Sequence, residues 1–284
     1  MKASTRYLHA IGLTVGLGSV LLCSAPLSAQ TFWTGNAGTT NWSDGFNWIY
    51  GVPPGLSDNV VFDSAYGGVV GTQGLVNNFV NSPFTISQLG FDTLTTSGYY
   101  TTQINPGMTV SIVPQTASAN AIAVGAWAGT GTPVAGGVND QVYATIVGAN
   151  GALNVNGASG TIRIEQPDGT SGSHLATLDL SGLGTFTATV SNILLGADFP
   201  LTRPNGTLVL AQTNTLTTGA WGAAIPGIML GCGGASSTDG GAGNLTLGQV
   251  NSFNADWLGC GLPPRGLAGH QHARLPHGYH QRLL

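Results

Sequence analysis

The densest group of chemically versatile side chains in this 284-residue sequence lies between residues 163 and 174, and consists of Arg163, Glu165, Asp168 and His174. Polysaccharide hydrolases and lyases use clustered carboxylates, and lyases usually add a basic residue that takes a proton. Glu165 is the only glutamate of the chain, however, and the group flanks a Pro-Asp-Gly turn. The motifs G-x-S-x-G and H-E-x-x-H are both absent. We therefore interpret the group as a solvated loop and expect no enzymatic activity.

Four of the six histidines lie in the last fifteen residues, as His270, His272, His277 and His280. Neutral imidazole is a common metal ligand, but this spacing fits no known metal motif. Back-translating this stretch and shifting it by one nucleotide can restore an alternating β-type sequence. We therefore interpret residues 262–284 as an atypical tail with a frameshifted ending, and expect no metal and no cofactor.

Two cysteines stand at matching places in the segments Leu230-Gly-Cys-Gly233 and Leu258-Gly-Cys-Gly261, which recur with an offset of 28. If the segments stack, the Cα atoms of Cys232 and Cys260 could lie within the ~4.4–6.8 Å that a disulfide requires. An oxidising compartment would permit this bond. The alternative is two buried free thiols in a ladder of small residues.

Three tryptophans, Trp33, Trp42 and Trp48, fall close together near the start of the chain, with the further aromatic residues Phe32, Phe46 and Tyr50. Such rings can form a platform that stacks on sugars, which predicts a carbohydrate-binding module. They can also cover the open end of a repetitive β-structure, whose unpaired edge would otherwise promote aggregation. Both interpretations remain open at this point.

The elements that must position these residues are short β-strands. From about residue 60 to 258, runs of four to seven residues rich in Val, Ile, Leu, Thr and Phe alternate with Gly, Asn, Ser and Asp. The segment 206–216 matches 243–253 as G-x-L-x-L-x-Q-x-N-x-[L/F], with an offset of 37. Recurring pairs of strands predict stacked coils, and hence a parallel β-helix or β-solenoid. A β-sandwich is the alternative.

Charge excludes several classes of partner. Only 6% of the residues are charged, where soluble domains carry about 25%. Residues 30–261 contain two arginines, no lysine and eleven acidic residues, a net charge of 2 − 11 = −9. Phosphate binding needs a basic surface, so nucleic acid and anionic lipid are excluded as partners. Surface glycans or other cell-surface proteins remain.

The N-terminal segment 1–29 has the three parts of a secretory signal peptide: Lys2 and Arg6, an apolar stretch over residues 8–23, and a small-residue region. We expect cleavage after Ala29, with Ala25 as the second choice. A single-pass anchor is the alternative, although the apolar run is shorter than the ~20 residues that span a bilayer. No later stretch could cross a membrane as a helix. The mature chain is therefore expected outside the cell or on its outer surface, with the periplasm as another option.

Residues 32–64 resemble the opening of bacterial proteins that carry autotransporter-associated β-strand repeats. The matching residues are Trp33-Thr-Gly35, Asn41-Trp-Ser43, Asn47-Trp48, Val52-Pro-Pro-Gly55 and Asp58-Asn-Val-Val-Phe62. The resemblance implies a right-handed parallel β-helix at a cell surface, with a structural or adhesin-like role. We accordingly expect an aromatic-rich N-terminal cap over residues 30–64 and β-solenoid repeats over 65–261. We see no membrane barrel or sorting helix near the end of the sequence, so the mode of anchoring stays open.

Overall fold

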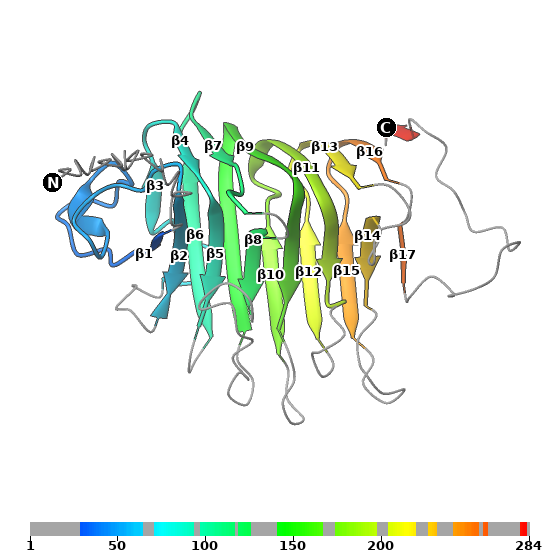
Figure 1. Cartoon of the computed structure of the whole chain (residues 1–284), viewed down its shortest axis with the longest axis horizontal. Helices are drawn as coiled ribbons and strands as arrows, with labels where there is room; N and C mark the ends of the chain where they lie inside the picture. Colours follow the sequence, from blue (N-terminus) through cyan, green and yellow to red (C-terminus); the bar gives the residue numbers. More distant parts are fainter. Residues whose placement is uncertain are drawn as a thin grey trace, which may run out of the picture.

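Strands and turns stack into one elongated pile along the chain (Figure 1). The computed structural model describes residues 29–64, 71–93, 97–116, 119–125, 141–166, 174–197, 204–219, 227–231, 241–255, 258–260 and 279–282. Nearly all of these residues lie in or between β-strands, and one short 3₁₀ turn, η1 (Gly45–Asn47), is present among them. The predicted all-β fold is confirmed.

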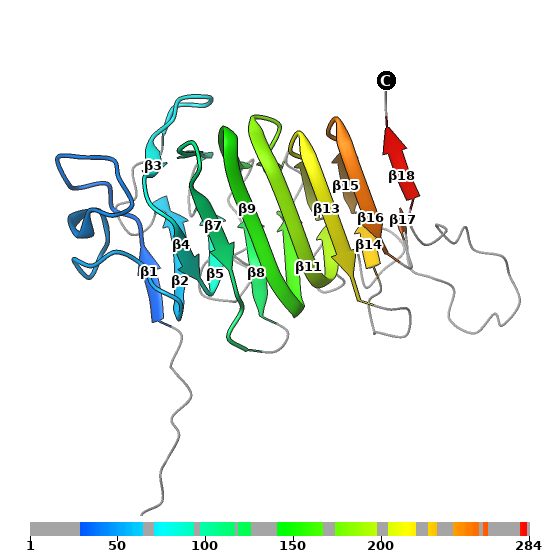
Figure 2. The same cartoon turned by 90° about the horizontal axis from the view of Figure 1, so that it is seen from above.

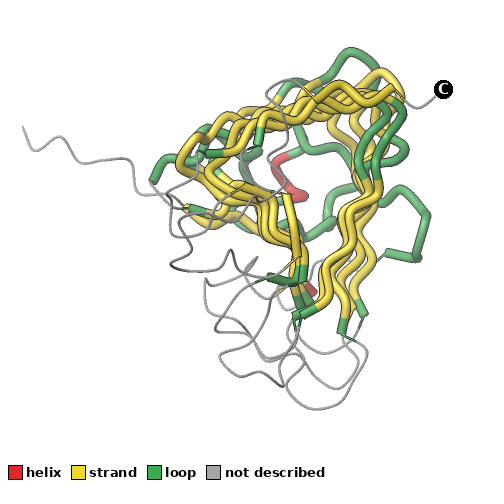
Figure 3. Tube along the Cα trace, turned by 90° about the vertical axis from the view of Figure 1, so that its right-hand side faces the viewer, coloured by secondary structure: helices red, strands yellow, loops and turns green. Residues whose placement is uncertain are grey.

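The strands form three walls, which line up behind one another in the end-on view (Figure 3). Wall 1 contains β3 (Asn78–Val80), β6 (Gly98–Ile104), the start of β9 (Gln141–Glu165), β10 (Leu175–Asp179), β12 (Asn205–Val209) and β15 (Ala242–Thr246). Wall 2 contains β4 (Phe84–Ile86), β7 (Thr109–Ile112), the middle of β9, the first part of β11 (Leu183–Leu195), β13 (Thr213–Thr218) and β16 (Val250–Asn254). Wall 3 contains β1 (Ala29–Phe32), β2 (Asp58–Asp63), β5 (Gln88–Asp92), β8 (Asn120–Gly125), the ends of β9 and β11, β14 (Gly227–Leu230) and β17 (Leu258–Cys260).

Each coil runs from wall 1 through wall 2 to wall 3 and pairs in parallel with the next coil. On wall 3 the sequence offset between register partners ranges from 29 (Val60 to Leu89) to 41 (Asn120 to Thr161). Among the described strands, only β18 (Tyr279–Arg282) pairs antiparallel, and it does so with β16 (Figure 2). This parallel stacking confirms the β-solenoid and shows that the β-sandwich alternative is wrong. The right-handed sense stays a prediction.

The repeat found in the sequence is a repeat of the structure. Gly206 pairs with Gly243 in wall 1, and Leu216 pairs with Phe253 in wall 2, which reproduces the offset of 37. Its asparagines stabilise turns. Asn214 and Asn251 are buried, and each side chain forms hydrogen bonds with the backbone of the turn before its strand. The Asn214 side chain accepts from Ala211 N (3.0 Å) and donates to Ala211 O (2.7 Å). It also donates to Asn251 Oδ1 in the next coil (2.9 Å).

Ladders of apolar side chains fill the interior. On wall 3 one ladder runs through consecutive coils as Val60, Leu89, Ile122, Ile162, Ile193, Ile228 and Leu258. Alternation along each strand places these side chains inward, and parallel register stacks them. Burial of such ladders is the main driving force for the fold.

The N-terminal segment is continuous with this stack. Strand β1 pairs with β2, and β2 pairs with β5, so the expected cap joins wall 3 directly. Ala29 is the first residue of β1, and the rest of the expected signal peptide lies outside the described residues. Cleavage after Ala25 would leave β1 whole, whereas cleavage after Ala29 would remove its first residue.

Candidate functional site

The three tryptophans pack against one another at the N-terminal end of the solenoid. Trp48 meets Trp33 at 5.0 Å and Trp42 at 5.5 Å between ring centroids, both edge to face. Trp42 Nε1 donates to Asn78 Oδ1 (2.7 Å) and Trp48 Nε1 donates to Trp42 O (2.8 Å). The three side chains are at most 2% exposed.

Such burial leaves no ring face for a sugar, so the platform prediction for Trp33, Trp42 and Trp48 is wrong. The rings lie against Phe62, which stacks on Phe91 of the next coil (5.2 Å). They therefore continue the aromatic interior, as the alternative of a covered end proposed. Of the other aromatic residues in this segment, Phe32 is buried, whereas Phe46 and Tyr50 are exposed.

The two cysteine segments stack in a different register from the expected one. Ile228 pairs with Leu258 and Leu230 pairs with Cys260, so the offset is 260 − 230 = 30 and not 28. Cys232 lies outside the described residues. The disulfide between Cys232 and Cys260 therefore stays a prediction, without the matching positions that motivated it. Likewise, His270, His272 and His277 lie outside the described residues.

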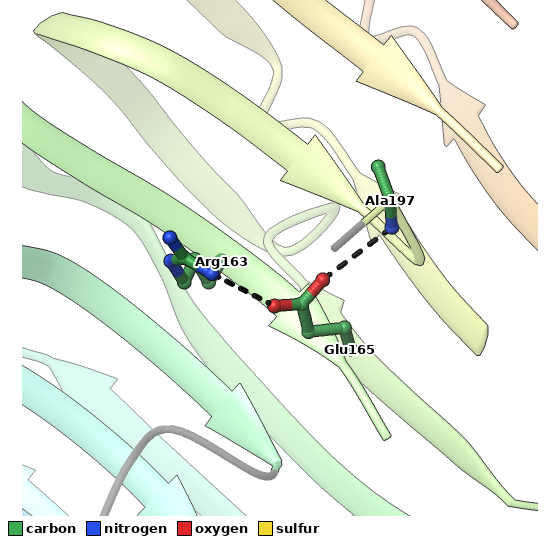
Figure 4. A network of polar contacts seen from close by, with 3 residues as sticks. All are labelled: Arg163, Glu165 and Ala197. Carbon is green, nitrogen blue, oxygen red and sulfur yellow. Dashed lines mark hydrogen bonds and ion pairs between the residues drawn. The ribbon is translucent and has the colours of Figure 1, made fainter. Parts of the chain in front are cut away.

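The polar group around Glu165 is buried, which corrects its interpretation as a solvated loop. Glu165 is 0% exposed at the end of β9, where wall 3 turns back toward wall 1. One carboxylate oxygen pairs with Arg163 Nη1 at 3.3 Å, and the other accepts from Ala197 N of the next coil at 3.4 Å (Figure 4). His174 is also buried, and its carbonyl accepts from Asn205 Nδ2 (3.0 Å). Asp168 lies outside the described residues.

This geometry makes Glu165 a bond between coils. Its two oxygens connect a side chain of its own strand to the backbone of the following coil. An acid that catalyses glycoside cleavage works with a second carboxyl group across the bond to be broken. Among the described residues, no three His, Cys, Asp or Glu side chains form a group that could hold a metal ion.

A second buried polar corner was missed from the sequence. Asp63 and Asp92 are register partners in neighbouring coils and are each 3% exposed. The Tyr100 hydroxyl donates to the carbonyl of Asp92 (2.6 Å). Burial raises the pKa of Tyr100 well above its ordinary value, and the charges of the two aspartates raise it further. The available signal was the repeated pair Phe-Asp, at 62–63 and 91–92.

The outer face of wall 2 carries a regular array of threonines, which the sequence reasoning also missed. Along β11 the inward residues Phe186, Ala188 and Val190 alternate with outward threonines, and β13 repeats this pattern. In-register pairs place three threonines of one coil beside three of the next: Thr185 beside Thr213, Thr187 beside Thr215, and Thr189 beside Thr217. All six are exposed or half-buried. The available signal was T-x-T-x-T at 185–189, repeated with offset 28 at 213–217.

The neighbouring coils extend this face with similar side chains. The central outward column of wall 2 is Thr85, Ser111, Asn154, Thr187, Thr215 and Ser252. From β4 to β16 the described strand segments of wall 2 contain no charged residue, and their aromatic side chains point inward. Wall 1 differs, because its outer face carries Asp179 and the stacked rings of Tyr99 and Tyr143 (5.2 Å).

Comparisons with protein-family models, curated proteins and solved structures find no match. The candidate site therefore rests on the geometry of this chain. Within the described ranges there is no helix long and apolar enough to span a bilayer. Among the outer faces of the three walls, that of wall 2 is the most uniform, and its chemistry is that of uncharged hydroxyl, methyl and amide groups.

Proposed function

We propose that this protein is an exported, non-enzymatic β-solenoid with a structural or adhesin-like role, and that the outer face of wall 2 is its contact surface. The observation that carries the proposal is the in-register array of uncharged polar side chains across that wall. A solenoid that presents one regular face is suited to many weak contacts with an extended partner. Surface glycans and other cell-surface proteins are the partner classes that a net negative chain, lysine-free over residues 30–261, can accept without ionic attraction.

The signal-peptide pattern of residues 1–29 supports export, which an adhesin-like role requires. Its test is a fusion of residues 1–29 to alkaline phosphatase, which becomes active only outside the cytoplasm. We expect activity for the fusion and none when Leu13 and Leu21 in the apolar stretch are changed to Arg. Activity that survives these changes would contradict the signal peptide.

Adhesion is tested by displaying the chain on non-adherent bacteria and counting the cells retained on glycan-coated and cell-coated surfaces. The double variant Thr187→Tyr with Thr215→Tyr places two large rings in the centre of wall 2. Its matched control is Thr177→Tyr with Thr207→Tyr, because Thr177 and Thr207 are register partners on wall 1. We expect the first variant to reduce retention and the control to leave it unchanged. Equal retention for all three proteins, or turnover of a polysaccharide by the wild type, would contradict the proposal.

A further inference from the structure

The threonine array of wall 2 has the form of a two-dimensional lattice. Along the solenoid axis its rows are separated by the spacing of neighbouring strands, ~4.8 Å, and along each strand alternate residues are ~6.6–6.8 Å apart. Threonine has few rotamers because it is β-branched, so its methyl and hydroxyl groups are held in place on a strand. Six such side chains in register therefore present fixed hydroxyl and methyl groups at two regular repeats.

The strands of the wall that carries the lattice run side by side in similar directions (Figure 2). Sheets normally twist, and untwisted sheets are stabilised by stacking and side-chain ladders. Strands β9, β11, β13 and β16 keep this alignment through parallel, in-register pairing across the wall. Inward ladders supply the support, since Leu153, Phe186 and the buried Asn214 occupy one column, and Val155, Ala188 and Leu216 the next.

The side chains on the outer face of wall 2 limit the classes of ligand that it can bind. An ionic ligand would find no charged partner on the described wall 2 segments of the strands from β4 to β16. The aromatic side chains of these segments, Phe84, Phe186 and Phe253, are buried, so a glycan on this wall would be held through hydrogen bonds and not by ring stacking. What remains is an uncharged lattice of hydroxyl groups, and the two repeats of the array are close to those of water oxygens on a prism face of ice.

We propose that the outer face of wall 2 binds ice. The outward hydroxyls of Thr185, Thr187 and Thr189, with their partners in β13, would take the positions of water molecules, while the methyl groups order the water between them. Binding would stop growth of the crystal at the covered surface. The proposal goes beyond the adhesive role and does not depend on it.

Partition into ice tests the proposal directly. The purified full-length chain is mixed with water from which a polycrystalline ice shell is slowly grown, and the protein in ice and in liquid is measured. We expect the wild type to enter the ice and to inhibit recrystallisation of small crystals. Thr187→Tyr with Thr215→Tyr is expected to abolish both effects, while the wall 1 control Thr177→Tyr with Thr207→Tyr retains them. The stacked pair Tyr99 and Tyr143 shows that outward tyrosine pairs are compatible with this fold.

A milder variant covers the case in which the tyrosine variant fails to fold. Thr215→Val removes one exposed hydroxyl and keeps the branched shape, so it is expected to weaken partition without changing the circular dichroism spectrum. Wild-type protein that stays wholly in the liquid would overturn the proposal, as would equal loss in the wall 1 control. Co-sedimentation with insoluble cellulose or chitin, without partition into ice, would overturn it in favour of a polysaccharide lattice. Because cell retention is measured without ice, its result separates failure of the adhesive role from failure of ice binding.

Discussion

Walls 2 and 3 of the solenoid share their inward architecture and differ on their outer faces. Both are parallel stacks with apolar ladders inside. On wall 3 the outward residues Val61, Ala123, Leu194 and Met229 are 0% exposed, whereas on wall 2 Thr189, Thr213 and Thr215 are exposed. The outer face of wall 3 is therefore largely buried along this column, in which Arg163 is partly exposed, whereas the outer face of wall 2 is open.

The difference teaches how the two walls can be distinguished in the sequence. A strand with both faces buried reads as a continuous apolar run, as in Ile193-Leu-Leu195, while a strand with one exposed face alternates, as in Thr185-Phe-Thr-Ala-Thr189. Both patterns occur within the single strand β11. Inward residues thus determine the stacking, and outward residues determine what each wall can contact.

The largest effect is expected from placing a charge on the two outer faces of β11. Leu194→Asp removes a fully buried apolar side chain and places a carboxylate beside its register partner Arg163, which already pairs with Glu165, so it should cost about 3–5 kcal/mol of the free energy of unfolding. Thr187→Asp on wall 2 should change it by no more than about 1 kcal/mol. Urea unfolding followed by far-UV circular dichroism measures both. Equal effects would contradict the assignment of one covered and one exposed outer face.

The next comparison contrasts the inner and outer faces of wall 2. Asn214→Ala leaves the buried N–H and carbonyl of Ala211 without their side-chain partner, and is expected to cost about 2–3 kcal/mol. Asn154 is half-buried on the outer face, where it accepts from Thr187 (2.6 Å), so Asn154→Ala should cost no more than about 1 kcal/mol. The same unfolding measurement applies. A larger cost for Asn154→Ala than for Asn214→Ala would contradict the stabilising role of Asn214 in the turn at Ala211.

Alternation and the repeat with offset 37 were sufficient to predict the fold, because inward side chains and strand pairing set the coil. The register of the cysteine segments was not predictable in the same way. A shift of two residues keeps the same side chains inward, so alternation alone cannot distinguish Leu230 opposite Leu258 from Leu230 opposite Cys260. The structure instead continues the inward ladder from Ile228 to Leu258.

Burial of the candidate site residues was the other feature beyond prediction, because it depends on contacts between distant segments. Trp42 donates to Asn78, 36 residues later, and Glu165 accepts from Ala197, 32 residues later. Local composition left a ring platform and a covered end both open for the tryptophans, and suggested a solvated turn around Glu165. The partners that bury them belong to neighbouring coils, which single-sequence patterns do not place.

Glu165→Gln and its control compare the buried end of wall 3 with the more exposed outer face of wall 1. An amide cannot accept with both of its terminal atoms, so either the contact with Arg163 or that with Ala197 N is lost, at an expected cost of about 1–3 kcal/mol. The control is Asp179→Asn on wall 1, a half-buried residue that accepts from Ser181 N (2.8 Å) and should lose less. Urea unfolding measures the cost of both variants. A Glu165→Gln variant as stable as the wild type would contradict a stabilising contact between coils through Glu165.

The smallest effect at neutral pH is expected at the corner where walls 1 and 3 meet. Tyr100→Phe removes the hydroxyl that donates to Asp92 O, at a cost of about 1 kcal/mol. Burial and the charges of Asp63 and Asp92 raise the pKa of Tyr100 in the folded state above the unfolded value of about 10. The stability that depends on a protonated Tyr100 is thus fully present below about pH 10. It falls by up to about 1.4 kcal/mol per pH unit above that.

The phenylalanine variant has no such loss, so the gap between it and the wild type should close and then reverse as the pH rises from about 8 to about 11.5. Urea unfolding at several pH values measures this crossing. Tyr50→Phe provides the control, because its ring is 66% exposed and its hydroxyl meets water in both states. A gap that stays constant with pH would mean that burial and the two aspartates do not raise the pKa of Tyr100 in the folded state.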